Sequence, residues 1–458
     1  KGKNKKGFDK KQNATTKPVA RSDDATDSAT PAVNPIMAAY EATSRGTDLM
    51  VTGALNAAIE AFSEALELHP TPDRQFRLAL AYEENGEPLK ASELYEAARD
   101  GEGADAVLQH DANVKLAHVW GHDLGDIKKG LEYLEDAMEK EGYEPTPVND
   151  AIAWDQKAYF VADEGRLEEA VALWDKAIEG MRAEIGKSDV SAETKEQLAE
   201  RMREGCFFRA VAKALLASSS DSKVGVEFAS LPSECEHLVD SWNYASSHYP
   251  KCHLEDLRQG RFFAGTHTML AEALRESRPD GLICEFGVFH GKSIRLIASL
   301  AGPDNPVDGF DTFQGIPEAW GDEPAGTYTA AAEIPQRVPA NVRFHVGLFS
   351  DTLPRYVKTL PPAEEMPVRL INVDCDLYQG TVEILQFLSD RIGPGTVLIF
   401  DEYLMTPTWR EDEYKAFKEA VKKYGWEYEY LSFCLNSKQT IVRITASKSF
   451  AGPAAVES

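Results

Sequence analysis

Two different spacings of apolar residues divide this chain. From about residue 36 to residue 217, apolar side chains return every three or four positions, which predicts a succession of amphipathic helices. After residue 280, short apolar runs alternate with helical segments, and each run predicts a buried strand. The alternation predicts a mostly parallel, doubly wound, Rossmann-like sheet, and the two closely spaced last strands predict an antiparallel edge. The predicted strands are 282–285, 307–310, 342–349, 368–374, 396–400, 426–432 and 439–444, with helices over 381–392 and 411–424.

A second regularity lies within the N-terminal helices. Ala58, Phe62, Ala65 and Pro70 follow the spacing A-x3-F-x2-A-x4-P, and related spacings begin 33, then 39, then 40 residues further on. Small residues let two helices approach closely, while the aromatic residue fills the space between helix pairs. The pattern resembles tetratricopeptide repeats over roughly residues 38–180. That resemblance implies an all-α solenoid that binds a protein partner and ends in a capping helix.

Composition sets the expected domain boundaries. The first residues are basic and then rich in Ser and Thr, without apolar periodicity, which predicts disorder. The run Ser218–Lys223 (SSSDSK) is typical of a linker, so we expect few contacts across it and independent folding of the helical part. The expected divisions are a disordered tail 1–35, a helical repeat domain 36–217, a linker 218–232, a sheet domain 233–446 and a flexible tail 447–458.

The first predicted strand ends in a glycine turn of the kind that binds a cofactor. Glu285 closes the strand, Gly287 and Gly291 follow, and a helix begins directly afterwards. Glycines let the backbone approach a ligand closely, and a new helix N-terminus offers free N–H groups. The spacing E-x-G-x-x-x-G fits S-adenosylmethionine better than the dinucleotide pattern G-x-G-x-x-G. We expect Glu285 and the turn to hold the methionine end, and Asp311, which ends the second strand, to bind the ribose.

Six carboxylates stand at or just beyond the ends of four predicted strands. Carboxyl ends of parallel strands share one edge of a sheet, and crowded carboxylates require cations. S-adenosylmethionine supplies an ammonium and a sulfonium, and oxygen ligands suit Mg²⁺. We expect Asp376, Asp401 and Glu402 to bind Mg²⁺ and Asp376 also to act as the general base. The six carboxylates are Glu285, Asp311, Asp374, Asp376, Asp401 and Glu402.

Five motifs also carry a resemblance to a known family. EFGVFHGKS, GFDTFQGIPEAW, VGLFSDTLP, VDCDLYQGT and IFDEY occur in this order within about residues 260–445. They resemble the macrocin and mycinamicin O-methyltransferases, which implies a class I, S-adenosylmethionine-dependent and metal-dependent enzyme. In that family Asp376 falls on the metal ligand and base, while Asp401 and Glu402 fall on a pair that is usually two Asp. The resemblance also implies further cofactor-binding residues at Ser293, Phe313, Gly347 and Asp374.

Charge and cysteine content bear on the kind of binding partner and on the cellular compartment. The net charge of −26 disfavours a nucleic-acid-binding protein, although seven Lys and Arg21 against Asp9 make residues 1–22 formally +7. Six cysteines without C-x-x-C pairs favour neither disulfides nor a zinc site, so we expect a reducing compartment, by default the cytoplasm. No apolar run has the length of a membrane span. Because the sequence starts with Lys rather than Met, we leave open a preceding targeting segment.

Three functions are compatible with these features. The leading one is an O-methyltransferase acting on a hydroxyl of a sugar-type or natural-product-type small molecule, with repeats that recruit or present a substrate. The second is a repeat-based scaffold with an inactive methyltransferase fold, against which the retention of all six carboxylates argues. The third is a methyltransferase that modifies a protein bound by the repeats. The sequence leaves the acceptor and the oligomeric state open.

Overall fold

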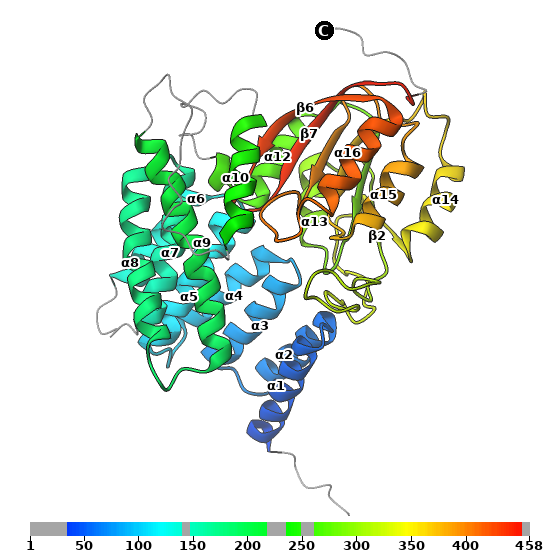
Figure 1. The fold of residues 1–458 in the computed structure, drawn as a ribbon. Helices are drawn as coiled ribbons and strands as arrows, with labels where there is room; N and C mark the ends of the chain where they lie inside the picture. Colours follow the sequence, from blue (N-terminus) through cyan, green and yellow to red (C-terminus); the bar gives the residue numbers. More distant parts are fainter. Residues whose placement is uncertain (1–33, 140–146, 218–234, 249–260, 451–458) are drawn as a thin grey trace, which may run out of the picture.

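The protein is represented by a computed structural model that describes residues 34–139, 147–217, 235–248 and 261–450 (Figure 1). The predicted tail 1–35 and linker 218–232 lie almost wholly outside the described residues, and so does most of the predicted tail 447–458. Among the helices within the described ranges, none combines the length and the hydropathy that crossing a bilayer requires.

The N-terminal part is a stack of antiparallel helix pairs, which we call the helical region (residues 35–217). Several of its helices begin at a residue whose side chain accepts a backbone N–H, as Asn34, Thr71 and Asp105 do. Its elements are α1 (Pro35–Val51), α2 (Leu55–Leu68), α3 (Pro72–Glu84), α4 (Pro88–Asp100), α5 (Ala106–His118), the π-helical turn η1 (Val119–Asp123), α6 (Ile127–Met138), α7 (Pro147–Asp163), α8 (Leu167–Ile185) and α9 (Ala192–Ala217).

The predicted spacing has a direct structural counterpart in the turns between paired helices. Gly53, Gly86, Gly125 and Gly165 follow the first helix of each pair, all with φ between 70° and 78°. They are 33, 39 and 40 residues apart, as the apolar pattern is. The positive φ explains why glycine stands at each turn. The α9 bounds also match the predicted capping helix.

The second part, the sheet region (residues 261–450), is built on one seven-stranded sheet of order β3-β2-β1-β4-β5-β7-β6. The first five strands in this order are parallel, and β7 and β6 are antiparallel, which confirms the predicted architecture. The strands are β1 (Leu282–Phe286), β2 (Val307–Asp311), β3 (Val342–Val346), β4 (Val368–Val373), β5 (Val397–Phe400), β6 (Trp426–Phe433) and β7 (Thr440–Ser447). The helices are α10 (Glu236–His248), which precedes the region, the 3₁₀ turn η3 (Arg261–Phe263), α12 (Thr266–Glu276), α13 (Lys292–Ala301), α14 (Phe349–Thr359), α15 (Tyr378–Phe387) and α16 (Glu413–Tyr424).

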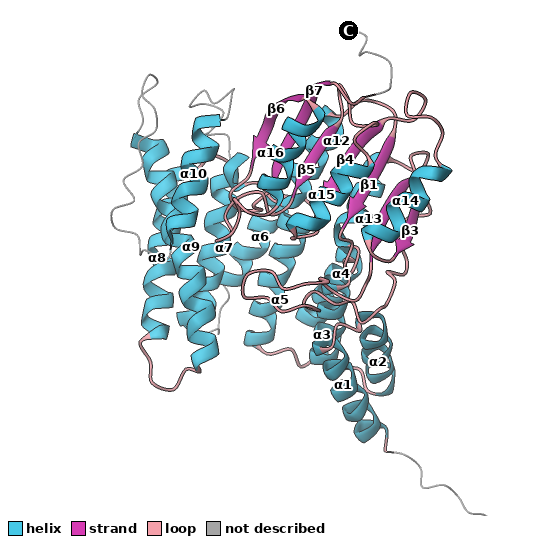
Figure 2. Ribbon diagram, turned by 45° about the vertical axis from the view of Figure 1, so that its right-hand side comes forward, coloured by secondary structure: helices cyan, strands magenta, loops and turns pink. Residues whose placement is uncertain are grey.

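Helices cover both faces of the sheet (Figure 2). Successive strand residues point to opposite faces, so Ile283 packs with α12 and α13, whereas Cys284 packs on the side of α14, α15 and α16. Two boundaries differ from the sequence-based expectation. The strand predicted over 342–349 ends at Val346, because Gly347 has a φ of 137° and α14 then begins at Phe349. The helix predicted over 381–392 is α15, which starts at Tyr378 and ends at Phe387.

The expectation of few contacts between the two parts is wrong. Phe263 of η3 lies 5.8 Å from the ring of Trp174 and 5.8 Å from that of Phe208, centroid to centroid. Through these rings a single apolar core runs from α8 and α9 into the sheet. The helical region and the sheet region therefore share one buried apolar core and are not two separately packed domains.

Three of the four turn glycines press directly on the sheet region. A Cβ at Gly86 would lie 2.6 Å from the Cα of Lys292, and one at Gly125 would lie 2.5 Å from the Nδ1 of His267. A Cβ at Gly53 would overlap the carbonyl oxygen of Thr329. These glycines therefore serve two purposes, since they permit a positive φ and also allow close approach, to backbone at Gly53 and Gly86 and to the His267 ring at Gly125.

Candidate active site

A cleft of about 1320 Å³ opens at the carboxyl ends of the parallel strands. One wall consists of the glycine turn after β1 and the segments that follow β2, β4 and β5. The opposite wall comes from the helical region, including residues of the α3–α4 turn and of η1. The predicted site residues that line it are Gly287, Ser293, Asp311, Asp374, Asp376, Asp401 and Glu402.

The glycine turn is shaped by close approach of two chain segments. Gly287 has a φ of 89°, and a Cβ there would overlap the carbonyl oxygen of Asp374. Gly291 has a φ of 83° and is the N-cap of α13, where no side chain occupies the free N–H groups. A left-handed glycine followed by an uncapped helix N-terminus is a suitable cradle for the carboxylate of a bound ligand.

Asp311 stabilises this turn with both of its carboxylate oxygens. Oδ2 accepts the backbone N–H groups of Val288 at 2.7 Å and Phe289 at 2.8 Å. Oδ1 accepts the N–H of Phe313 at 2.7 Å. The side chain thus ties the turn after β1 to the end of β2, at the rim of the cleft. Binding of a ribose by Asp311 stays a prediction, and the carboxylate retains lone pairs for it.

Four of the predicted cofactor-binding residues support the cleft without lining it. Glu285 is fully buried beneath the turn, and its Oε1 accepts a hydrogen bond from Asn372 at 2.9 Å. Burial raises the pKa of Glu285 to about 8. The ring of Phe313 packs in the core, 5.8 Å from that of Phe344. Gly347 donates its N–H to the Asp311 carbonyl at 2.9 Å, and Gly291 begins α13.

Beyond the turn lies a set of five carboxylates that we call the acid cluster. Asp376 has a positive φ of 62°, an unusual conformation for a residue that is not glycine and one that needs support from its surroundings. Burial, together with the negative charge of Asp401, raises the pKa of Asp376 to about 7. Burial also raises the pKa of Glu402 to about 8, although Lys438 opposes the shift. The acid cluster comprises Asp374, Asp376, Asp401, Glu402 and Glu413.

Three residues of this site were missed at the sequence level. Glu413, at the start of α16, is fully buried and accepts the N–H of Glu402 at 3.0 Å. Gln439 donates to Asp401 Oδ1 at 2.6 Å, and the Lys438 ammonium lies 3.8 Å from Glu402 Oε2. Glu413 follows a loop and the other two come from the β6–β7 turn, so the strand-end rule does not reach them. An acidic residue opening the helix after Asp401-Glu402 was the only local signal.

Comparison with known proteins identifies the family to which this chain belongs. A sequence profile described as a methyltransferase domain matches residues 284–403. The demethyldecarbamoylnovobiocin O-methyltransferase of Streptomyces niveus is 30% identical over 207 residues, which span 37% of this chain and 76% of that protein. The chain belongs to the class I O-methyltransferases of the sugar and natural-product type.

Two further relatives of this methyltransferase act on glycosylated natural products by name. One is the 8-demethyl-8-(2,3-dimethoxy-alpha-L-rhamnosyl)-tetracenomycin-C 4'-O-methyltransferase of Streptomyces olivaceus, 31% identical over 32% of this chain and 59% of the relative. The other is the mycinamicin III 3''-O-methyltransferase of Micromonospora griseorubida, 27% identical over 33% of this chain and 63% of the relative. All three matches cover well under half of this methyltransferase.

The acid cluster of the methyltransferase has the donor atoms that a hard divalent cation prefers. All five side chains offer carboxylate oxygens, and Glu402 Oε2 and Glu413 Oε1 are buried without a hydrogen-bond partner in the described part of the chain. Burial raises the pKa of both Asp376 and Glu402, and the negative charge of Asp401 adds to each shift. Asp376, Asp401 and Glu402 therefore fit Mg²⁺ by chemistry. Their ligand atoms do not all lie within 4.8 Å of one another, so holding an ion requires their side chains to rotate inward.

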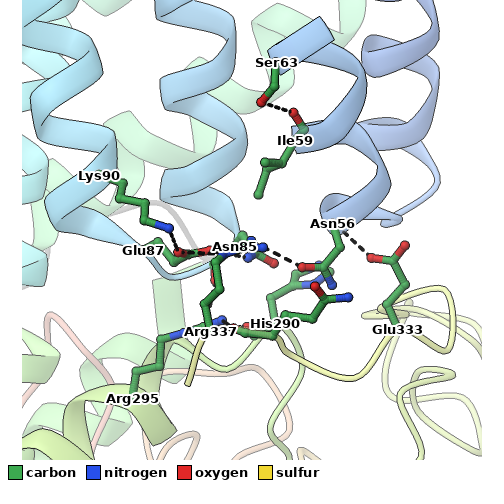
Figure 3. A network of polar contacts seen from close by, with 11 residues as sticks. Asn56, Ile59, Ser63, Asn85, Glu87, Lys90, His290, Arg295, Glu333 and Arg337 are labelled. Atoms are coloured by element: carbon green, nitrogen blue, oxygen red, sulfur yellow. Dashed lines mark hydrogen bonds and ion pairs between the residues drawn. The ribbon is translucent and has the colours of Figure 1, made fainter. Parts of the chain in front are cut away.

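Polar contacts join the helical region of the methyltransferase to α13 and to the loop between β2 and β3 (Figure 3). Arg295 of α13 donates to the backbone carbonyl of Asn85 at 2.8 Å. Glu333, in the long loop between β2 and β3, accepts the N–H of Asn56 at 2.8 Å. Arg337 of the same loop pairs with Glu87. The first two helix pairs thus hold both α13 and the loop that follows Asp311.

Proposed function

We propose that this protein transfers the methyl group of S-adenosylmethionine to a hydroxyl oxygen of a sugar-bearing, natural-product-type small molecule. The acceptor oxygen forms the new bond to the methyl carbon while the carbon–sulfur bond breaks, which leaves S-adenosylhomocysteine. The hydroxyl proton goes to a base on the protein. The three relatives named above support this reaction type, because each is an O-methyltransferase by name.

The observation that carries the proposal is the adjacency of the glycine turn and the acid cluster. Gly287 touches the backbone of Asp374, and Asp376 follows two residues later along the same wall of the cleft. A cofactor held by the turn therefore presents its methyl group next to carboxylates that can hold and deprotonate a hydroxyl. Alignment of oxygen, carbon and sulfur in such a displacement supplies a large part of the rate enhancement.

Each residue has a defined part in this proposal. The N-terminus of α13 binds the carboxylate of the methionine end, and Asp311 binds the ribose. Glu285, buried beneath the turn, acts from outside the cleft lining by offering negative charge to the ammonium. Asp376 accepts the proton of the acceptor hydroxyl. Its pKa of about 7 suits a group that must take up and release a proton near neutral pH. Mg²⁺ bound by Asp376, Asp401 and Glu402 would lower the pKa of the acceptor hydroxyl.

We also propose that the helical region is a tetratricopeptide-like array that limits and presents the acceptor. A Cβ at Gly46 would lie 2.7 Å from the ring of Phe62, which is the tight small-against-aromatic packing that such repeats require. Glu83 and Glu84 at the end of α3 and Leu89 at the start of α4 line the cleft. An acceptor bound in the cleft would therefore contact both regions at once.

The test separates the acceptor classes. The full-length protein is incubated with methyl-labelled S-adenosylmethionine, Mg²⁺ and either a panel of deoxysugar glycosides or a cell extract separated by molecular size. Label in glycosides or in the low-mass fraction, and none with Asp376→Asn, is the expected result. Label in the protein fraction would instead indicate a methyltransferase of repeat-bound proteins. Cofactor binding without label in any fraction would favour an inactive scaffold.

A further inference from the structure

A histidine and aspartate cluster lies in the wall of the cleft that the helical region contributes. His118 ends α5, and His122 and Asp123 belong to the π-helical turn η1. One ligand atom from each residue falls within 4.8 Å of the other two. The imidazole rings stack 4.9 Å apart at 11°, so both present a nitrogen toward the same carboxylate. In the sequence the three residues have the spacing H-x3-H-D.

The distances in this cluster are close to those around a tetrahedral metal ion. Ligands about 2.0–2.1 Å from a central ion lie roughly 3.3 Å from each other. His122 Nδ1 is 3.2 Å from Asp123 Oδ1, and His118 Nε2 is 3.8 Å from the same oxygen. With all three ligand atoms within 4.8 Å of one another, small rotations of the side chains would bring them to the spacing that one ion requires. The fourth corner of the tetrahedron is left for water or a ligand from the cleft.

Burial and unmet hydrogen bonding point to a missing ligand at the same place. The Asp123 side chain is only 1% exposed, and its Oδ2 is buried with no hydrogen-bond partner among the described residues. The imidazoles of His118 and His122 both lie beside this carboxylate. Neutral imidazole is the form that binds metals.

A lysine of the sheet region at present balances the charge of Asp123. The Lys292 ammonium lies 2.6 Å from Asp123 Oδ1, while its side chain is 47% exposed. Lys292 is the first residue of α13, the helix that begins at the cofactor turn. An ammonium on a flexible, half-exposed stem can be displaced by a divalent ion, because the ion gains two imidazole ligands as well as the carboxylate.

We propose that His118, His122 and Asp123 form a binding site for a transition-metal ion of the Zn²⁺ or Co²⁺ type, in which the metal replaces the Lys292 ammonium beside Asp123. Two imidazoles and one carboxylate select such an ion over Mg²⁺. The site is separate from the acid cluster, which offers only oxygen and comes from the other wall of the cleft. Metal binding would detach Lys292 from η1 and so loosen one tie between the helical region and the cofactor helix.

To test the site, the full chain is first freed of metal with a chelator, and the chelator is then removed. The protein is titrated with Co²⁺ in the presence of excess Mg²⁺. Excess Mg²⁺ competes for the acid cluster, and four-coordinate, imidazole-bound Co²⁺ absorbs visible light far more strongly than six-coordinate, oxygen-bound Co²⁺. We expect one such Co²⁺ per chain, displaced by Zn²⁺. His122→Ala and the nearly isosteric Asp123→Asn should weaken binding by on the order of a hundredfold. His267→Ala, in the same cleft but outside the cluster, is the matched control and should bind as wild type does.

A second variant tests the competition with lysine. Lys292→Met removes the ammonium, so Co²⁺ affinity should rise by about tenfold or more if the ion and Lys292 compete for Asp123. Circular dichroism of each variant confirms that it is folded. The proposal is overturned if wild type shows no tetrahedral Co²⁺ absorption, if His122→Ala binds as tightly as wild type, or if only Lys292→Met binds. If only Lys292→Met binds Co²⁺, the ion pair between Lys292 and Asp123 prevents metal binding in the natural protein.

Discussion

Arg337 and Glu87 join the two regions of the protein across 250 residues of sequence: Nε of the arginine donates to both carboxylate oxygens of the glutamate, at 2.9 and 3.0 Å. Arg337 has a positive φ of 54°, so its part of the loop between β2 and β3 is held in a conformation that the chain does not prefer. Four other non-glycine residues of this loop also have positive φ, at Phe313, Tyr328, Ala331 and Ala332. The helical region supplies part of the support that such a loop requires.

Removal of this pair should weaken acceptor binding more than cofactor binding. Glu87→Ala and Arg337→Ala should each destabilise the protein, and a double-mutant cycle should give a coupling energy of about 1–2 kcal/mol, reduced from a fully buried value because the arginine is 36% exposed. Thermal unfolding measures the coupling, and steady-state kinetics measure the acceptor KM. Lys90→Ala removes another, more exposed partner of Glu87 and serves as the control. A coupling energy of zero would show that the pair contributes nothing to docking.

Two glycine substitutions should differ sharply although both glycines have a φ near 85°. Gly302→Ala, with nothing within 4 Å of the added Cβ, should cost only the conformational strain of a φ of 84° with a ψ of 161°, about 1–3 kcal/mol. Gly287→Ala adds a collision with the carbonyl oxygen of Asp374 and should also abolish cofactor binding. Calorimetric titration with S-adenosylmethionine and thermal melting distinguish the two. Equal behaviour of the variants would contradict the close approach at Gly287.

Turnover should depend on a divalent ion and on Asp376. Asp376→Asn keeps the size of the side chain but removes a ligand charge and the proposed base, so turnover should fall by about a thousandfold or more while cofactor affinity is retained. Glu402→Asp creates the two-Asp pair that the family resemblance implies, and it should stay active. Assays with and without EDTA check the ion. Full activity in excess EDTA would rule out the metal mechanism but leave the methyltransferase fold untouched.

Stability without cofactor should fall as the pH rises, because of Glu285. Its pKa in the folded protein is raised to about 8 from 4.5, so between these values the folded state holds a proton that the unfolded state has lost. Stability therefore decreases with rising pH across this window, by at most about 1.4 kcal/mol per pH unit from this group. Glu285→Gln cannot titrate and should flatten the pH dependence of urea unfolding between pH 5 and pH 8. Parallel curves for wild type and variant would contradict the raised pKa.

The parallel sheet was predictable because each core strand is a short apolar run that ends in a polar residue. The same rule located Asp376, Asp401 and Glu402, since strand ends meet at one edge of the sheet. It could not locate Glu413 or Lys438, which tertiary folding brings to that edge from a helix start and a hairpin turn. Nor does any local pattern connect Gly86 with Lys292, whose contact depends on how the two regions dock.

Asp311 lies where the sequence predicts it, but it also has a structural role that the sequence does not predict. Its position at the end of β2 predicts a ribose ligand, and it does lie at the cleft. Its three hydrogen bonds to backbone N–H groups are invisible in the sequence, because they depend on the path of the turn after β1. Substitution of Asp311 will therefore disturb the turn as well as any bond to the cofactor.

The docked glycine turns also determine where this protein can accept extra sequence. At Gly53, Gly86 and Gly125 the chain is in close contact with the sheet region. An epitope inserted at one of these turns would therefore separate the helical region from the sheet region. The connection between α4 and α5 is different, because a Cβ at Gly103 would meet nothing within 4 Å. A fluorophore or affinity tag placed at Gly103 would leave the catalytic cleft undisturbed, and natural variation in length should collect at such connections.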